Sequence, residues 1–148
     1  MAFIDDQPLP VEIDGENCHE VEFNFTVHNY RDIVTVGYTQ EHKIKCNTLE
    51  TEWSIWLIFQ KQDSDISCII NISRTDVKVA SVTVSFRMII YNPIHHDFME
   101  ISACPETEVA SNWNFKQTAK PVVPSGNENL LNGENLSVKF CLKVAGCH

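Results

Sequence analysis

Apolar and polar residues alternate along most of this chain, which is the pattern of half-buried β-strands. In residues 21–27, apolar side chains occupy every second position and polar residues stand between them. The same pattern returns in residues 53–59, 66–72, 82–90 and 136–144. Because successive side chains of a strand point to opposite faces, each of these segments predicts a strand with one apolar face.

Polar connectors and prolines separate the predicted strands. Residues 61–65 are polar and join two alternating segments, which predicts a hairpin. Asn92-Pro93 ends the longest segment, because proline lacks the N–H needed in a β-ladder and restricts the residue before it. Shorter alternating segments predict further strands at residues 33–38, 42–46, 98–104 and 113–118.

No segment keeps an apolar stripe at helical spacing over three turns, apart from a short turn predicted near residues 127–131. About eight short strands with polar turns predict an all-β fold, an eight-stranded antiparallel β-sandwich. The length of 148 residues and the apolar fraction of 43% fit one packed domain. We expect a flexible tail over residues 1–18 and the sandwich domain over residues 19–146.

The start of the chain and its charge exclude several classes of protein. Asp5 and Asp6 stand where a secretion signal would need a basic start followed by a long apolar run. The apolar stretches are also far shorter than the roughly 20 residues of a spanning helix. A net charge of −9, with the basic residues scattered, opposes binding to nucleic acid. These features predict a soluble monomer of the cytoplasm or nucleus, with no membrane or nucleic-acid partner.

The cysteines leave two interpretations open. Their spacings are wide and irregular, and no secretion signal is present, which favours reduced thiols over a disulfide framework. The even count and three N-glycosylation sequons, at Asn24, Asn71 and Asn135, favour the alternative of an extracellular, disulfide-stabilised recognition or adhesion domain. The six cysteines are Cys18, Cys46, Cys68, Cys104, Cys141 and Cys147.

Trp113-Asn114-Phe115 places two large aromatic side chains on the same side of one extended segment. The loop that follows contains Pro121, Pro124 and Gly126, so this segment does not belong to a helix. Such a pair either fills the interior of the sandwich or forms a surface that holds a peptide.

Candidate catalytic and metal-binding motifs are weak. His95-His96-Asp97 has the side chains of a zinc site, but adjacent histidines on an extended segment point apart. Cys18-His19 and Cys147-His148 lack the paired spacing of a zinc knuckle. The sequence also has no nucleophile turn and no glycine-rich phosphate loop. We therefore expect no catalytic residues, no metal and no cofactor, with a cryptic hydrolase or metal protein as the remaining hypothesis.

Six segments, taken in order, resemble the MATH family (meprin and TRAF homology), and in particular the substrate-binding domain of speckle-type POZ proteins. The resemblance extends from about Val21 to Val144. The six segments are FNFTVHNY at residues 23–30, EWSIWL at 52–57, DISCII at 65–70, VSFRMIIYN at 84–92, NWNFK at 112–116 and ENLLNGENLSV at 128–138.

The resemblance implies a non-enzymatic module that binds short extended peptides of partner proteins in a surface groove. In speckle-type POZ proteins it further implies an adaptor that presents those partners to a cullin-type ubiquitin ligase. The chain leaves no room for a POZ dimerisation domain, so we expect that link to be indirect, lost or removed by truncation. The implied groove has wall or floor residues Ile69, Phe86, Trp113 and Phe115, and edge residues Asn112, Asn114 and Lys116.

Three departures from the family pattern predict a changed partner motif. Asn114 stands between the two aromatic residues, where the family commonly has glycine. Ile69 is aliphatic where an aromatic residue is expected. Pro105 replaces the tyrosine that the family has eight positions before the tryptophan.

Overall fold

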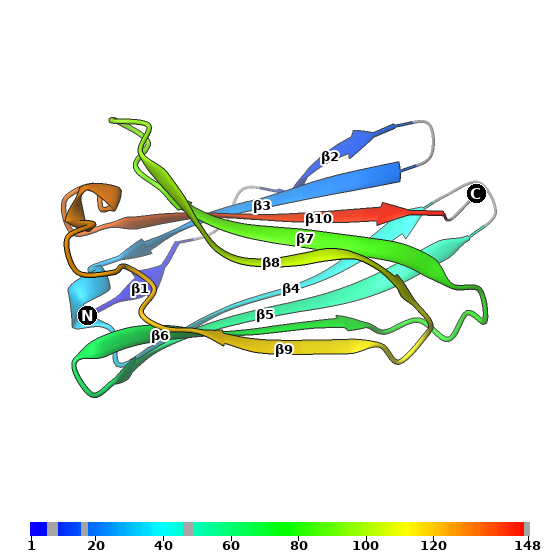
Figure 1. Cartoon of the computed structure of the whole chain (residues 1–148), viewed down its shortest axis with the longest axis horizontal. Helices are drawn as coiled ribbons and strands as arrows, with labels where there is room; N and C mark the ends of the chain where they lie inside the picture. The colour runs from blue at the N-terminus through cyan, green and yellow to red at the C-terminus, as the bar shows by residue number, and fades with distance from the viewer. Residues whose placement is uncertain (6–8, 16–17, 46–48, 147–148) are drawn as a thin grey trace.

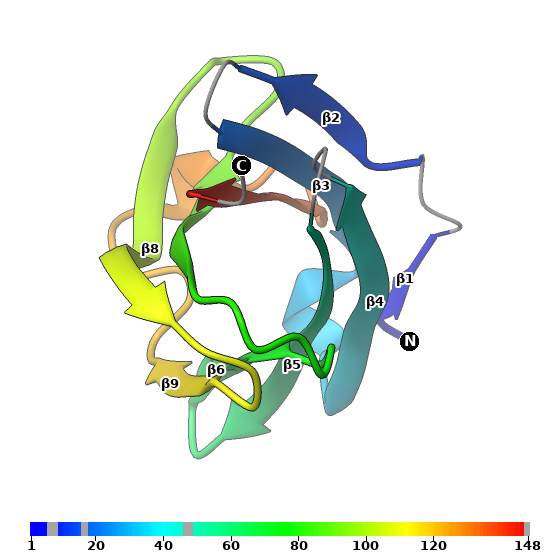
Figure 2. The same cartoon turned by 90° about the vertical axis from the view of Figure 1, so that its right-hand side faces the viewer.

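A computed structural model describes residues 1–5, 9–15, 18–45 and 49–146 of the chain. Within these residues the fold is all-β, with ten strands and two short 3₁₀ turns at Tyr30–Asp32 and Glu128–Leu130. The strands form two antiparallel sheets that face each other as the layers of a sandwich (Figure 1, Figure 2). The predicted all-β sandwich is therefore confirmed.

The first sheet has the strand order β1-β3-β10-β7-β8, and β2 pairs with β3 on the same edge as β1. Its strands are β1 (Phe3–Ile4), β2 (Val11–Asp14), β3 (Cys18–His28), β7 (Val82–Tyr91), β8 (Phe98–Val109) and β10 (Leu136–Ala145). The second sheet has the order β4-β5-β6-β9. Its strands are β4 (Thr35–Lys45), β5 (Glu50–Gln62), β6 (Asp65–Arg74) and β9 (Asn114–Ala119).

The ten strands differ from the predicted eight in two places: two predicted strands are joined into one, and two strands form before residue 18. Residues 33–38 and 42–46 were expected to form two strands, whereas a single strand, β4, continues through the polar residues between them. The full length of β4 pairs with β5, from Thr35 opposite Gln60 to Lys45 opposite Glu50. This pairing provides backbone hydrogen bonds where side-chain burial is weak, so the polar stretch stays in the strand.

Two further strands lie in residues 1–18, where a flexible tail was expected. Both β1 and β2 pair with β3. Two histidine–carboxylate contacts reinforce this pairing, Asp14 with His19 at 2.7 Å and Asp5 with His28 at 2.5 Å. A third, Glu12 with His42 at 2.6 Å, joins β2 to β4 of the second sheet. The prediction of a flexible tail is therefore wrong for β1 and β2, which belong to the sheet and cover the outer edge of β3.

The core lies between the sheets and is rich in aromatic side chains. Phe25 of β3 stacks on Tyr38 of β4 with ring centroids 4.1 Å apart, which joins the two sheets at one side. Phe86 of β7 stacks on Phe140 of β10 at 5.3 Å near the middle of the first sheet. Trp53 of β5 is fully buried, as the sequence predicts for a structural residue.

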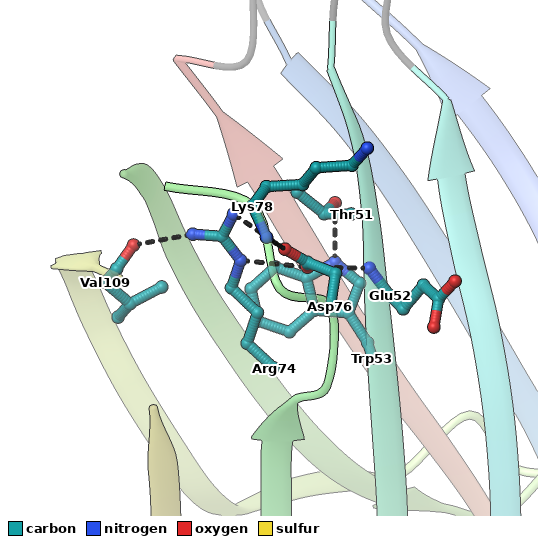
Figure 3. Close-up of polar contacts among 7 residues, drawn as sticks. All are labelled: Thr51, Glu52, Trp53, Arg74, Asp76, Lys78 and Val109. Atoms are coloured by element: carbon teal, nitrogen blue, oxygen red, sulfur yellow. Dashed lines mark hydrogen bonds and ion pairs between the residues drawn. The ribbon is translucent and has the colours of Figure 1, made fainter. Parts of the chain in front are cut away.

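A buried ion pair ties the second sheet to the first at one end of the sandwich (Figure 3). Arg74, the last residue of β6, makes two hydrogen bonds of 3.0 Å to the carboxylate of Asp76. It also donates to the backbone oxygen of Val109 in β8 at 3.1 Å. The carboxylate in turn accepts the backbone N–H groups of Glu52 and Lys78, both at 3.0 Å. Every oxygen of Asp76 is therefore satisfied although the side chain is buried.

Burial by itself would raise the pKa of Asp76, because it penalises the charged form. The hydrogen bonds from Arg74, Glu52 and Lys78, together with the charge of Arg74, outweigh that effect and hold the pKa below its usual value. A lowered folded-state pKa contributes stability above the unfolded value near 4, and this stability is lost as the pH falls through the folded-state pKa.

We expect Asp76→Asn to lower the free energy of unfolding by about 3 to 5 kcal/mol at pH 7, because it leaves the buried Arg74 without its counter-charge. The difference from the unmodified protein should begin to shrink as the pH falls below about 4, where Asp76 becomes protonated in the unfolded chain, and should disappear only below the lowered pKa of the folded state. Urea unfolding at pH 7 and at pH 3 measures both effects. Asp63→Asn, at an exposed carboxylate, is the matched control and should change stability by no more than about 0.5 kcal/mol.

Candidate functional site

The two sheets end on the same side of the sandwich, at β8 and β9. Each is the last strand of its sheet, and Figure 2 shows them next to each other, away from β1. A side-chain hydrogen bond of 2.7 Å from Ser102 Oγ in β8 to Gln117 Oε1 in β9 links them. On the other side of the molecule β1 and β2 cover β3. Within the described residues, β9 therefore offers an uncovered strand edge.

The side chains of β9 divide between its two faces. Phe115, Gln117 and Ala119 lie opposite the buried residues Ile72, Ile70 and Cys68 of β6, so they point toward the space between the sheets. The alternate residues Asn114, Lys116 and Thr118 point to the outer face of the second sheet, and all three are exposed.

The backbone of β9 also has two sides. Trp113 and Arg74 lie directly opposite each other, and Arg74 N–H donates to Trp113 O at 2.9 Å. Backbone hydrogen bonding alternates along an antiparallel pair, so every second residue after Trp113 bonds to β6. The residues between them direct their N–H and C=O groups to the open edge. These residues are Asn114, Lys116 and Thr118, which can pair with an additional strand.

The aromatic residues beneath this edge connect the surface to the core. Trp113 is half-buried and packs edge-on against Trp53, with ring centroids 6.4 Å apart. Phe115, also half-buried, lies 6.3 Å from Trp113 and 4.9 Å from Phe86. Phe86 is only 1% exposed, so it belongs to the core. Trp113 and Phe115 therefore act as packing residues that stay partly exposed beside β9.

The seven residues predicted for a groove fall into three groups. Phe86, Trp113 and Phe115 pack together, with Phe86 inside the core and the other two half-buried beside β9. Ile69 does not join them, because it lies opposite Thr118 on the outer face of the second sheet, with Asn114 and Lys116. Asn112 is exposed in the turn before β9 and adopts a left-handed conformation with φ of 69°. Ile69 therefore does not line the same surface as the aromatic residues.

Two departures from the family pattern have a structural explanation. The side chain of Asn114 points to the outer face, so it adds no bulk on the inner face where Phe115 lies. Pro105 stands in the edge strand β8 at a bulge, where two residues of β8 oppose the single residue Ser85 of β7. Proline is tolerated at edges and bulges because it has no N–H to contribute to a ladder.

Trp56 is a surface feature that the sequence prediction missed. It is 49% exposed on the outer face of β5, opposite Asn71 of β6, which in turn lies opposite Lys116. A shallow depression of about 190 Å³ lies beside it, lined by Ser54, Trp56, Asn71, Ser73 and Thr75. The sequence signal was present, because Trp56 occupies a polar-phase position in the alternating segment 53–59.

Two polar clusters lie at the surface of the first sheet. His95, His96 and Asp97 are exposed in the turn after β7. Glu20, Glu22 and Cys141 place their ligand atoms within 4.8 Å of one another on the outer face of the first sheet. Burial raises the pKa of the Cys141 thiol to about 11, and the charges of Glu22 and Glu20 add to the shift. The thiolate that a soft metal needs is therefore disfavoured.

The four described cysteines, Cys18, Cys68, Cys104 and Cys141, are free, whereas Cys46 and Cys147 lie outside the described residues. Cys68 and Cys104 are buried like small apolar residues. Burial also raises the pKa of the Cys68 thiol.

The chain matches no protein-family model and no curated protein. In the part of the chain that the structure describes, no helix is long and apolar enough to cross a bilayer.

We expect Phe86→Ala to lower the free energy of unfolding by about 3 to 5 kcal/mol, because it removes a buried aromatic ring from the core. Trp56→Ala should cost about 1 kcal/mol or less, since half of that side chain already faces solvent. Urea unfolding of the two variants provides the comparison. Similar losses of unfolding free energy in the two variants would show that Trp56 contributes to the core, contrary to its position on the outer face.

Alkylation of the unfolded, unreduced protein should modify Cys18, Cys68, Cys104 and Cys141 completely, because none of them is paired. In the folded protein Cys68 should react most slowly, since it is fully buried and its thiolate is disfavoured. Peptide mapping by mass spectrometry identifies each site. If one of the four cysteines resisted alkylation until the protein was reduced, it would be part of a disulfide. That result would favour the extracellular alternative.

Proposed function

We propose that this chain is a non-enzymatic peptide-recognition module of the MATH type, which binds a short extended segment of a partner protein along the open edge of β9. The observation that carries the proposal is the uncovered edge of β9 with half-buried Trp113 and Phe115 beside it. Strand addition to an exposed sheet edge is a common mode of peptide recognition, in which backbone bonds supply affinity and alternate side chains supply specificity.

Binding of this kind uses both sides of β9. The peptide backbone pairs with the outward N–H and C=O groups of Asn114, Lys116 and Thr118. Every second peptide side chain turns toward the inner face of the second sheet and contacts Trp113 or Phe115. The others lie over the outer face, near Lys116. A buried aromatic anchor of such an interface typically contributes about 2 kcal/mol or more to binding.

The arrangement of the strands and the aromatic residues supports the MATH assignment. Without the two short strands before residue 18, eight described strands remain, four in each sheet. Trp53, Phe86 and the pair Trp113 and Phe115 come from three of the segments that carry the resemblance. The structure packs them into one connected cluster with ring separations of 4.9 to 6.4 Å.

The adaptor role is the further part of the proposal. A MATH-type module of the cytoplasm or nucleus would present its bound partner to a cullin-type ubiquitin ligase, directly or through another protein. This part rests on the resemblance to speckle-type POZ proteins. The extracellular disulfide-stabilised alternative draws no support from the described cysteines, all four of which are free.

We expect Lys116→Pro to weaken peptide binding at least tenfold while the domain stays folded. Proline removes the outward N–H of residue 116, and its ring obstructs an incoming strand, whereas the bonds from β9 to β6 are kept. The lost hydrogen bond contributes about 1 kcal/mol, and together with this obstruction it accounts for the expected tenfold loss of affinity. The measurement is a selection of extended peptides from a random display library, followed by titration of a selected peptide.

Lys116→Ala is the matched control, because it removes the same side chain and keeps the N–H. It should bind within about threefold of the unmodified domain, since a surface ion pair contributes little. Thermal unfolding confirms that both variants are folded. Equal binding by the proline and alanine variants, or selection of no peptide by the intact domain, would rule out recognition at this edge.

A further inference from the structure

A second pocket lies on the outer face of the first sheet, at the end where β7 turns into β8. Its volume is about 430 Å³, within the range of small recognition pockets. The lining residues are Ile89, Tyr91, Asn92, Pro93, His96, Phe98 and Lys139. This pocket faces away from the second sheet, which contains β9, so the proposed peptide edge does not account for it.

Three neighbouring strands build the pocket. Ile89 and Tyr91 point outward from β7, because the residues between and before them are buried. Lys139 of β10 lies directly opposite Ile89, and Phe98 of β8 lies opposite Tyr91. The floor and walls are thus set by the register of the sheet rather than by a loop.

The turn that closes the pocket is fixed by Asn92. The buried Asn92 amide donates to the backbone oxygens of Asn129 and Leu131, at 2.9 and 3.0 Å. Its Oδ1 accepts the N–H groups of Ile94 and His95, at 2.9 and 3.2 Å. These bonds hold the turn against the segment before β10, so the pocket is formed before any ligand binds.

The apolar residues at the pocket are more exposed than the fold requires. Phe98 is 67% exposed and Ile94, in the adjoining turn, is 63% exposed. Large apolar side chains gathered around a concave surface favour contact with another molecule. The exposed rim extends beyond the pocket itself, which favours a protein segment over a small enclosed ligand.

The charge of the pocket defines the partner further. Lys139 Nζ lies 5.7 Å from the centre of the Tyr91 ring and forms no ion pair with a described carboxylate. The other nearby cation, Arg87, is already paired with Glu100 at 2.6 Å. The pocket lining contains no carboxylate, and His96 is its only other titratable cation. A carboxylate at the rim would therefore find an available ammonium group on an apolar surface.

We propose that this pocket binds a partner peptide in which a bulky apolar side chain is followed by one acidic residue. The apolar side chain lies against Tyr91 and Phe98, and the carboxylate pairs with Lys139. The net charge of −9 disfavours a longer acidic tract, whereas a single carboxylate beside Lys139 is within the screening length of about 8 Å. The site is independent of β9, so the protein can engage two segments on opposite faces.

The test uses NMR titration of the isotope-labelled full chain with the tetrapeptides Ac-Gly-Phe-Asp-Gly-NH₂ and Ac-Gly-Phe-Asn-Gly-NH₂. We expect saturable shifts at residues 89–98 and 139, and about fivefold tighter binding of the Asp peptide, the contribution of an exposed ion pair. In Lys139→Gln the two peptides should bind equally. In Phe98→Ala both should bind more weakly.

Lys143→Gln is the matched control, since Lys143 lies on the same strand and the same face but outside the pocket. It should keep the preference for the Asp peptide. The proposal is overturned if neither peptide gives saturable shifts at millimolar concentration, if the shifts lie at β9, or if Lys139→Gln keeps the preference. Amide spectra of the free variants establish that each one is folded.

Discussion

The Arg74–Asp76 ion pair is the constraint on which the open side of this sandwich depends. Arg74 closes the end of β6, bonds to the backbone of β8 through Val109, and donates its own N–H to Trp113. One residue therefore sets the spacing of the sheets and the start of β9. A buried guanidinium is tolerated here because its carboxylate partner is itself held by two backbone N–H groups. Without that support the aromatic residues beside β9 would lack a fixed frame.

The two sides of the sandwich differ in how their edges are protected. An uncovered edge strand invites pairing with other chains, and proteins usually cover or charge such edges. Here β1 and β2 cover β3, whereas β9 carries only Lys116 as a charged residue within the strand. The Ser102–Gln117 bond holds β8 and β9 together at one point and leaves the backbone of β9 accessible. The proposed strand addition at β9 relies on this asymmetry.

The sequence predicts this fold well wherever burial alternates along a strand, and less well elsewhere. The segments around Phe23, Trp53 and Phe140 have one fully buried face, so their period-two pattern is clear. By contrast, β1 and β2 are held by pairing and by histidine–carboxylate contacts, which leave no periodic signal. For the candidate site, Phe86, Trp113 and Phe115 pack against one another, with Phe86 inside the core. Ile69 does not, because it is out of phase with the apolar positions of the alternating segment 66–72, and its assignment to the groove followed the family resemblance rather than that pattern.

The two candidate surfaces differ in how far they can change without harm to the fold. Trp113 and Phe115 pack against core residues, so replacing them alters stability as well as recognition. Specificity at the β9 edge can therefore be adjusted mainly through exposed neighbours such as Asn114 and Lys116. The pocket near Lys139 has the opposite character, because Phe98 is exposed and the turn beside it is held by Asn92 rather than by the ligand-facing side chains. Exposed residues such as Phe98 can therefore change with little effect on the fold, whereas the buried Asn92 cannot.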